Sequence, residues 1–145
     1  EGLRMSVKDL KDESKQSEGD PHIKAKIRQL RGERARTRMM AEVPDADVVI
    51  TNPTHFAVAL KYDAESMAAP KVVAKGQDNI AFRIREVAEE NNVPIVENPP
   101  LARGLYASAD LDREIPTEFF KAVAEVIGYV MRLQGKMRGR SRTAG

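Results

Sequence analysis

DVVITNPTHFAVAL, residues 47–60, is the stretch that decides how this chain folds. Two runs rich in apolar and β-branched residues, 47–51 and 56–60, have the composition of strands. Between them stands the tetrapeptide Asn52-Pro53-Thr54-His55, which begins with two residues that favour tight turns. The stretch therefore predicts two strands of one sheet that are joined by a short turn.

The Asn52-Pro53 bond permits an unusual reaction of the backbone. Because proline has no N–H, the usual attack of the next backbone nitrogen on an asparagine side chain is closed. The Asn52 side-chain nitrogen can instead add to its own main-chain carbonyl and expel the Pro53 nitrogen. This reaction leaves a C-terminal succinimide and cuts the chain. It needs the side chain to be held against the carbonyl, which a tight turn can supply.

Thr54 and His55 would assist this reaction, since they place a hydroxyl and an imidazole near the reacting carbonyl. Histidine titrates near neutral pH, so His55 can move a proton or polarise the site. Asn98-Pro99 is an internal control, because it lacks the Thr-His pair and leads into a predicted helix. Asn-Pro alone is usually a turn, and we predict a cut only at Asn52-Pro53.

Beyond this stretch, strand and helix patterns alternate along the chain. The remaining predicted elements are a short strand at 71–74, a helix around 80–88, a strand at 94–97, a short helix around 101–109, and a last helix from about Pro116 that ends by Gly135. The fold class is therefore α/β: a small mixed sheet of about four strands with surrounding helices, preceded by a long charged helical arm.

Charge divides the chain into three predicted regions. The helical arm, residues 1–42, has 11 Lys and Arg against 8 Asp and Glu, whereas residues 43–131 have 8 against 14. Residues 132–145 have 5 basic residues and no acidic residue. We therefore predict a basic arm (1–42), a globular domain (43–135) and a basic, flexible tail (136–145).

The arm is predicted to be helical in two pieces. Ser6 begins a pattern that resembles a capping box, and Asp20-Pro21 restarts the helix. A narrow apolar stripe runs beside the basic residues Lys24, Lys26, Arg28 and Arg31. The simpler interpretation of these basic residues is a solvated helix face. The alternative is a segment close to the anionic headgroups of a membrane.

The last predicted helix carries two neighbouring apolar stripes: Phe119, Val123, Val126 and Val130 form one, and Phe120, Ala124, Ile127 and Met131 form the other. We favour the interpretation that both stripes are core. In the alternative, the second stripe is partly exposed and joins the small apolar loop 68–70 as a docking patch for extended segments. The candidate docking residues are then Ala69, Pro70, Ala124 and Ile127.

Composition excludes several kinds of site. The chain has no Cys and only two His, so we predict no thiolate chemistry, no metal and no cofactor. No apolar run approaches the length of a membrane span, and no signal peptide is visible. A nucleic-acid-binding function is weakened by the acidic central region and the absence of Trp. A hydrolase that uses His55 with Asp45 or Asp63 lacks a recognisable nucleophile.

Several motifs in order resemble the FlhB/YscU family of export-switch proteins of bacterial type III secretion. The resemblance spans about residues 18–134 and rests on the segments 18–24, 39–40, 52–60, 69–76, 84–86, 93–95 and 99–106. Pro99-Pro100-Leu101-Ala102-Arg103 and the arm ending Arg38-Met39-Met40 look more flagellar than injectisome-like.

This resemblance implies a component of the flagellar export gate that cuts itself between Asn52 and Pro53 and so switches the class of exported substrate. It also implies a preceding membrane domain in the bacterial inner membrane, with this chain on the cytoplasmic face. The implied partners are other export-gate proteins, export substrates and a ruler-type protein, with no nucleic acid. Because the reaction consumes its own backbone, we do not expect a turnover enzyme. An injectisome counterpart with the same switch is the alternative.

Overall fold

The computed structural model describes residues 19–53 and 55–144, with side chains as far as residue 135. The chain divides into two compact units, Glu1–Arg38 and Met39–Gly145. Within the described residues, no helix is both long enough and apolar enough to cross a membrane.

The second unit is built on a four-stranded mixed sheet in the order β3-β2-β1-β4. The strands are β1 (Val48–Asn52), β2 (Phe56–Lys61), β3 (Lys71–Gln77) and β4 (Ile95–Glu97). β1 is antiparallel to β2 and parallel to β4, and β2 is antiparallel to β3. β1 is therefore hydrogen-bonded on both sides.

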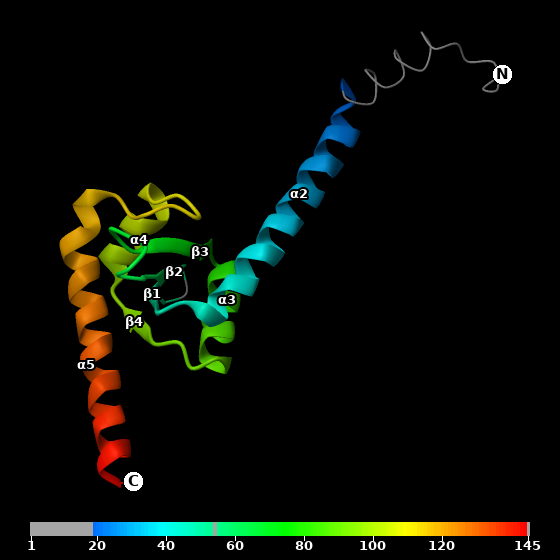
Figure 1. Ribbon diagram of the computed structural model, residues 1–145. Coiled ribbons are helices and arrows are strands. Elements are labelled where there is room, and N and C mark those ends of the chain that lie inside the picture. The colour runs from blue at the N-terminus through cyan, green and yellow to red at the C-terminus, as the bar shows by residue number, and fades with distance from the viewer. Residues whose placement is uncertain (1–18, 54, 145) are drawn as a thin grey trace, which may run out of the picture. The chain divides into compact units, whose positions relative to one another are not determined.

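Helices cover both faces of this sheet (Figure 1). They are α3 (Asn79–Glu90), α4 (Pro99–Ser108) and α5 (Phe120–Ala144), with the short 3₁₀ helices η2 (Val43–Asp45) and η3 (Thr117–Phe119) before β1 and α5. Val48 and Ile50 pack with α4 and α5, whereas Val49 packs with α3. Successive strand residues thus enter different cores, which explains why the central strands are apolar throughout. The predicted α/β class is confirmed.

Two predicted element ends were wrong. β3 continues past Ala74 to Gln77, because its hydrogen-bond ladder with β2 extends to the Phe56–Gln77 pair. The last helix does not end at Gly135 but continues to Ala144. A glycine inside a helix costs only about 1 kcal/mol relative to alanine, so it need not end one. Residues 136–144, predicted as a flexible tail, are the C-terminal part of α5.

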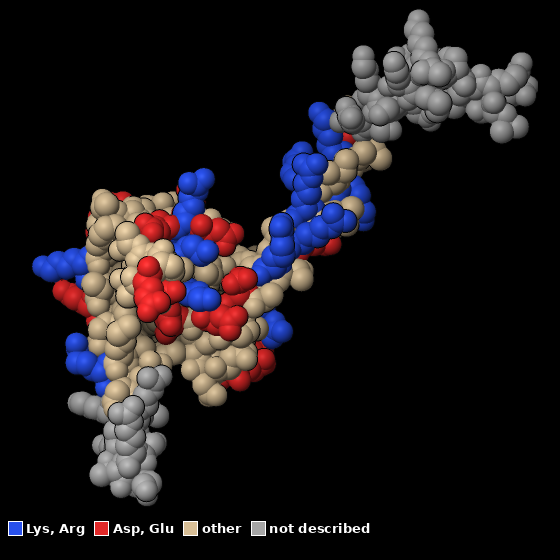
Figure 2. Space-filling view, in the orientation of Figure 1, with Lys and Arg blue, Asp and Glu red and all other residues tan. Residues whose placement is uncertain are grey.

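Residues 21–42 of the arm form α2 (Pro21–Glu42). Asp20 caps its start as predicted, since the His22 N–H donates to Asp20 Oδ1 at 2.8 Å. The prediction of an earlier helical piece at Ser6 lies outside the described residues. The apolar stripe Ile23, Ile27 and Leu30 remains exposed, and basic side chains gather along the helix (Figure 2).

Candidate functional site

The candidate site is the turn that joins β1 to β2. Asn52 and Phe56 are the last paired residues of these strands, so the ladder clamps both ends of the turn. The His55 N–H donates to the Asn52 carbonyl at 3.0 Å and closes the turn. Asn52 and Pro53 are half-buried and His55 is exposed, while Thr54 lies outside the described residues.

The hydrogen bond to the Asn52 carbonyl has a chemical consequence. In the cyclisation of asparagine this carbonyl is the electrophile, and its oxygen gains negative charge when the side-chain nitrogen adds to the carbon. The His55 N–H is a donor already aimed at that oxygen. Donors that are in place before the reaction stabilise developing charge without reorganisation. The turn therefore provides one of the groups that the reaction needs.

The imidazole of His55 has a carboxylate partner that the sequence did not reveal. Its Nδ1 lies 3.7 Å from Asp78 Oδ1, and both side chains are 64% exposed. Asp78 follows β3 and lies beside the turn because of the register between β2 and β3. Nothing in the sequence signals this pairing, since the two residues are distant along the chain and no motif joins them.

The hydrolase alternative finds no support in this geometry. Asp45 lies before β1 and Asp63 follows β2, so each is separated from the turn by the length of a strand. The Asp63 carboxylate instead accepts hydrogen bonds from the Glu65 N–H at 3.0 Å and the Ser66 hydroxyl at 2.9 Å. These bonds lower the pKa of Asp63 from its ordinary value of 3.8. The structure therefore does not bring His55 together with either carboxylate.

The control dipeptide Asn98-Pro99 begins α4, as predicted. The Asn98 side-chain Oδ1 accepts a hydrogen bond from the Leu101 N–H at 3.3 Å, and Pro99 occupies the first turn of the helix. This is the ordinary N-cap role of asparagine.

The four candidate docking residues lie together. Ala69, Pro70, Ala124 and Ile127 all line one cavity of about 350 Å³, together with Tyr62, Ala68, Phe120, Gly128 and Met131. The favoured interpretation of α5, in which both apolar stripes are core, was wrong. Phe120 is 40% and Met131 is 57% exposed, whereas Val123 is fully buried. Whether this cavity binds exported segments remains a prediction.

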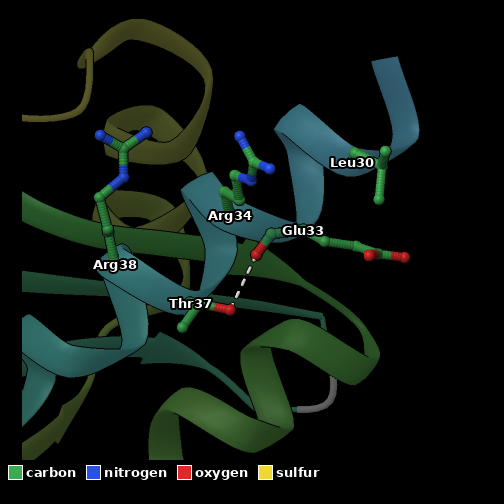
Figure 3. A pocket seen from close by; sticks show the side chains of 5 residues that line it. All are labelled: Leu30, Glu33, Arg34, Thr37 and Arg38. Atoms are coloured by element: carbon green, nitrogen blue, oxygen red, sulfur yellow. Dashed lines mark hydrogen bonds between the residues drawn. The ribbon is translucent and has the colours of Figure 1, made fainter. Parts of the chain in front are cut away.

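The basic residues of the arm line two shallow depressions along α2. Lys24, Arg28 and Arg31 surround Ile27 in one of them, and Lys26 is exposed nearby. In the other, of about 680 Å³, Arg34 and Arg38 point the same way beside Thr37 (Figure 3). The Thr37 hydroxyl donates to the Glu33 carbonyl at 2.9 Å. The described residues contain no cluster of acidic and His side chains that would hold a metal.

Comparisons with known proteins agree on one protein family. A model of the FlhB HrpN YscU SpaS family matches residues 1–130. The chain is 58% identical over 132 residues to the flagellar biosynthetic protein FlhB of Escherichia coli K12, which covers 91% of this chain and 35% of the relative. The chain thus spans roughly a third of the length of the curated relatives it matches.

Solved structures share the fold. The cytoplasmic domain of FlhB from Shewanella putrefaciens is 54% identical with a TM-score of 0.69, and the match covers 72% of this chain and 81% of that domain. An EscU C-terminal domain with an Asn-to-Ala substitution is 32% identical with a TM-score of 0.61, covering 63% and 92%. Other EscU variants replace the Pro directly after this Asn and the His three residues beyond it. This is the spacing of Asn52, Pro53 and His55.

Proposed function

Because the chain belongs to the FlhB HrpN YscU SpaS family, we propose that it is part of a flagellar type III export component that cuts itself between Asn52 and Pro53. The cut switches the class of exported substrate. One observation carries the proposal: Asn52-Pro53 lies in a turn clamped by two strands and closed by the His55 N–H on the Asn52 carbonyl. The 54% identity to a FlhB domain against 32% to EscU favours the flagellar over the injectisome alternative.

The reaction begins when the Asn52 side-chain nitrogen adds to the Asn52 main-chain carbonyl carbon and loses a proton. The carbonyl oxygen carries the negative charge of the tetrahedral intermediate, next to the His55 N–H. When this intermediate collapses, the C–N bond to Pro53 breaks and the proline nitrogen takes up a proton. The products are a C-terminal succinimide on residue 52 and a new N-terminus at Pro53. Thr54 and His55 assist with geometry or proton transfer, and no cofactor takes part.

Cutting this bond leaves the fold held together without a covalent link. β1 stays between β2 and β4, with hydrogen bonds to both strands. Val48, Val49 and Ile50 are fully buried, so separating the fragments would expose core surface to water. The change is therefore confined to the turn, where residues 53–55 are released at one end. The reaction occurs once per chain, so the protein is not a turnover enzyme.

Intact mass under denaturing conditions, followed by native size exclusion, tests the proposal. We expect fragments of residues 1–52 and 53–145 that elute together in native buffer. A single full-length mass after long incubation at neutral pH would overturn it. Fragments from a cut at Asn98-Pro99 would contradict the assignment of the site.

The second part of the proposal is that the cavity beside α5 binds extended segments of exported proteins. It is lined by apolar side chains and is open to solvent, as a site for extended export segments requires. The exported proteins, a ruler-type protein and other export-gate proteins are the expected partners. Equilibrium binding of a fluorescent peptide from an export substrate would test this part.

The third part concerns the membrane. The complete protein would be anchored in the bacterial inner membrane with this chain on the cytoplasmic face, and the basic residues of α2 would lie near anionic headgroups. Cosedimentation of the chain with vesicles that contain phosphatidylglycerol should be lost when Lys24, Lys26, Arg28 and Arg31 are all changed to Gln. Equal binding of the parent to vesicles of phosphatidylcholine alone would contradict an electrostatic role.

A further inference from the structure

Asp78 is an acidic residue at the turn to which the reaction above assigns no part. We propose that Asp78 is a positioning residue, which holds the His55 imidazole in place while Asn52 cyclises. The inference rests on the proposed self-cleavage and adds a residue from outside the Asn52–His55 tetrapeptide to it.

Asp78 contacts His55 at two points. The Asp78 N–H donates to the His55 carbonyl at 2.9 Å, which continues the β2–β3 ladder by one position beyond the Phe56–Gln77 pair. The Asp78 carboxylate lies 3.7 Å from His55 Nδ1. The backbone bond sets the distance between the two residues, and the carboxylate then faces one particular ring nitrogen.

The backbone of Asp78 is unusual and supports a special role. Its φ of 53° and ψ of −113° lie in a region that residues other than glycine rarely adopt. Asp78 stands at the N-cap of α3, yet its side chain makes no capping hydrogen bond. The carboxylate is therefore not held by a cap hydrogen bond and can face His55. Strained residues of this kind cluster at functional sites, where the surrounding structure holds them in place.

The carboxylate would act through the imidazole. With Nδ1 facing Asp78, Nε2 is the nitrogen left to take the proton that Asn52 Nδ2 loses and to return it to the Pro53 nitrogen. No proton is gained or lost overall, and His55 is cationic only between the two transfers. The Asp78 carboxylate opposite Nδ1 restricts the rotation of the ring. Since both side chains are largely exposed, water screens the pair and the effect on rate is modest.

The test compares Asp78→Gly with the parent chain. Glycine accepts the backbone conformation of residue 78 and removes the whole side chain, including the carboxylate. The rate of cutting is followed by pulse-labelled cell-free synthesis, and the midpoint of thermal unfolding is measured on the same variants. We expect Asp78→Gly to cut about two- to five-fold more slowly, with an unfolding midpoint that is unchanged or higher. A merely structural role would not lower the rate of a variant that is as stable as the parent.

Three controls make the result specific. Asp112 also has a positive φ, of 62°, but its N–H bonds to Val72 at the far end of β3, so Asp112→Gly should cut at the parental rate. Asp78→Asn keeps the shape without the charge and should fall between Asp78→Gly and the parent. In a His55→Ala background, where cutting is expected to be slow but measurable, Asp78→Gly should have no further effect.

The possible results distinguish a failure of this inference from a failure of the proposed self-cleavage. If the parent cuts and Asp78→Gly cuts at the same rate, this inference is overturned and the proposed function stands. Equal slowing by Asp78→Gly with and without His55 would also overturn the inference. An uncut parent would overturn the proposed function and the inference together.

Discussion

Asn52-Pro53 and Asn98-Pro99 are the same dipeptide at neighbouring positions of one sheet. Each lies at the carboxyl end of a strand, β1 in one case and β4 in the other, and these strands are parallel neighbours. The Asn98 N–H even donates to the Thr51 carbonyl at 2.9 Å. The dipeptide itself and its strand position therefore cannot explain why only one of these bonds should break.

The two sites differ in the surroundings of the asparagine side chain. Both asparagine carbonyls accept a backbone N–H, from His55 and from Ala102, so polarisation of the carbonyl alone does not distinguish the sites. The Asn98 side chain, however, is engaged by the Leu101 N–H at the start of α4. Asn52 instead lies in a turn that also holds His55, whose imidazole is paired with the Asp78 carboxylate. A helix start fixes the amide for capping, whereas the strand-to-strand turn gathers groups that can assist its attack.

The largest expected effect comes from exchanging each asparagine for alanine. Asn52→Ala removes the attacking nitrogen and should leave the chain uncut, as judged by intact mass. Asn98→Ala should still cut fully, but it loses a helix cap and should reduce the free energy of unfolding by about 0.5–2 kcal/mol. Cutting in Asn52→Ala, or its loss in Asn98→Ala, would break the comparison.

A change in the packing of α4 should affect stability without affecting the cut. A Cβ on Gly104 would lie 2.8 Å from the Phe119 ring, so Gly104→Ala forces the ring or the helix to shift. We expect the free energy of unfolding to fall by about 1–3 kcal/mol. Urea titration measures this loss, and the rate of cutting in the absence of urea should match that of the parent.

Docking should be separable from cutting. Ala124 is exposed at the edge of the α5 cavity, so Ala124→Asp should fold and place a charge among apolar side chains. We expect about ten-fold weaker binding of an export-substrate peptide, or about 1.4 kcal/mol. Ala124→Ser is the matched control. Unchanged binding by both variants would remove the cavity from the proposed function, and the cut should be normal in both.

The smallest effect is expected at Asp63, far from both dipeptides. Hydrogen bonds lower its pKa in the folded chain, so the charged form stabilises the fold above the ordinary pKa of 3.8. This contribution is lost as the pH falls through the lowered pKa. Asp63→Asn should therefore show a slightly smaller drop in unfolding midpoint between pH 6 and pH 2.5 than the parent. Identical drops would show that the hydrogen bonds of Asp63 do not affect stability.

Local features were predictable from the sequence, and long-range ones were not. The Asn52–His55 turn, the two strands beside it and the Asp20 cap depend on residues that are close along the chain. The end of β3 depends on its ladder with β2, and the approach of Asp78 to His55 depends on the same register. Register is a property of the assembled sheet, which explains why Asp78 was missed. The exposure of Phe120 and Met131 was predicted only as the less favoured alternative, because the helical period does not show how much of a helix face is covered.

Because β1 is hydrogen-bonded to a strand on each side, the proposed cut would change how the domain responds to force. α2 leads through η2 directly into β1, so residue 52 becomes the C-terminal end of a fragment that runs from the arm into the centre of the sheet. Once the bond to Pro53 is broken, tension applied along α2 would reach the rest of the domain through the two ladders of β1 and through the core packing of its side chains. Those ladders run along the strand and would be loaded in shear, where many hydrogen bonds share the force. The cut would replace a covalent connection by a non-covalent one, which would hold under thermal motion and separate under sustained tension.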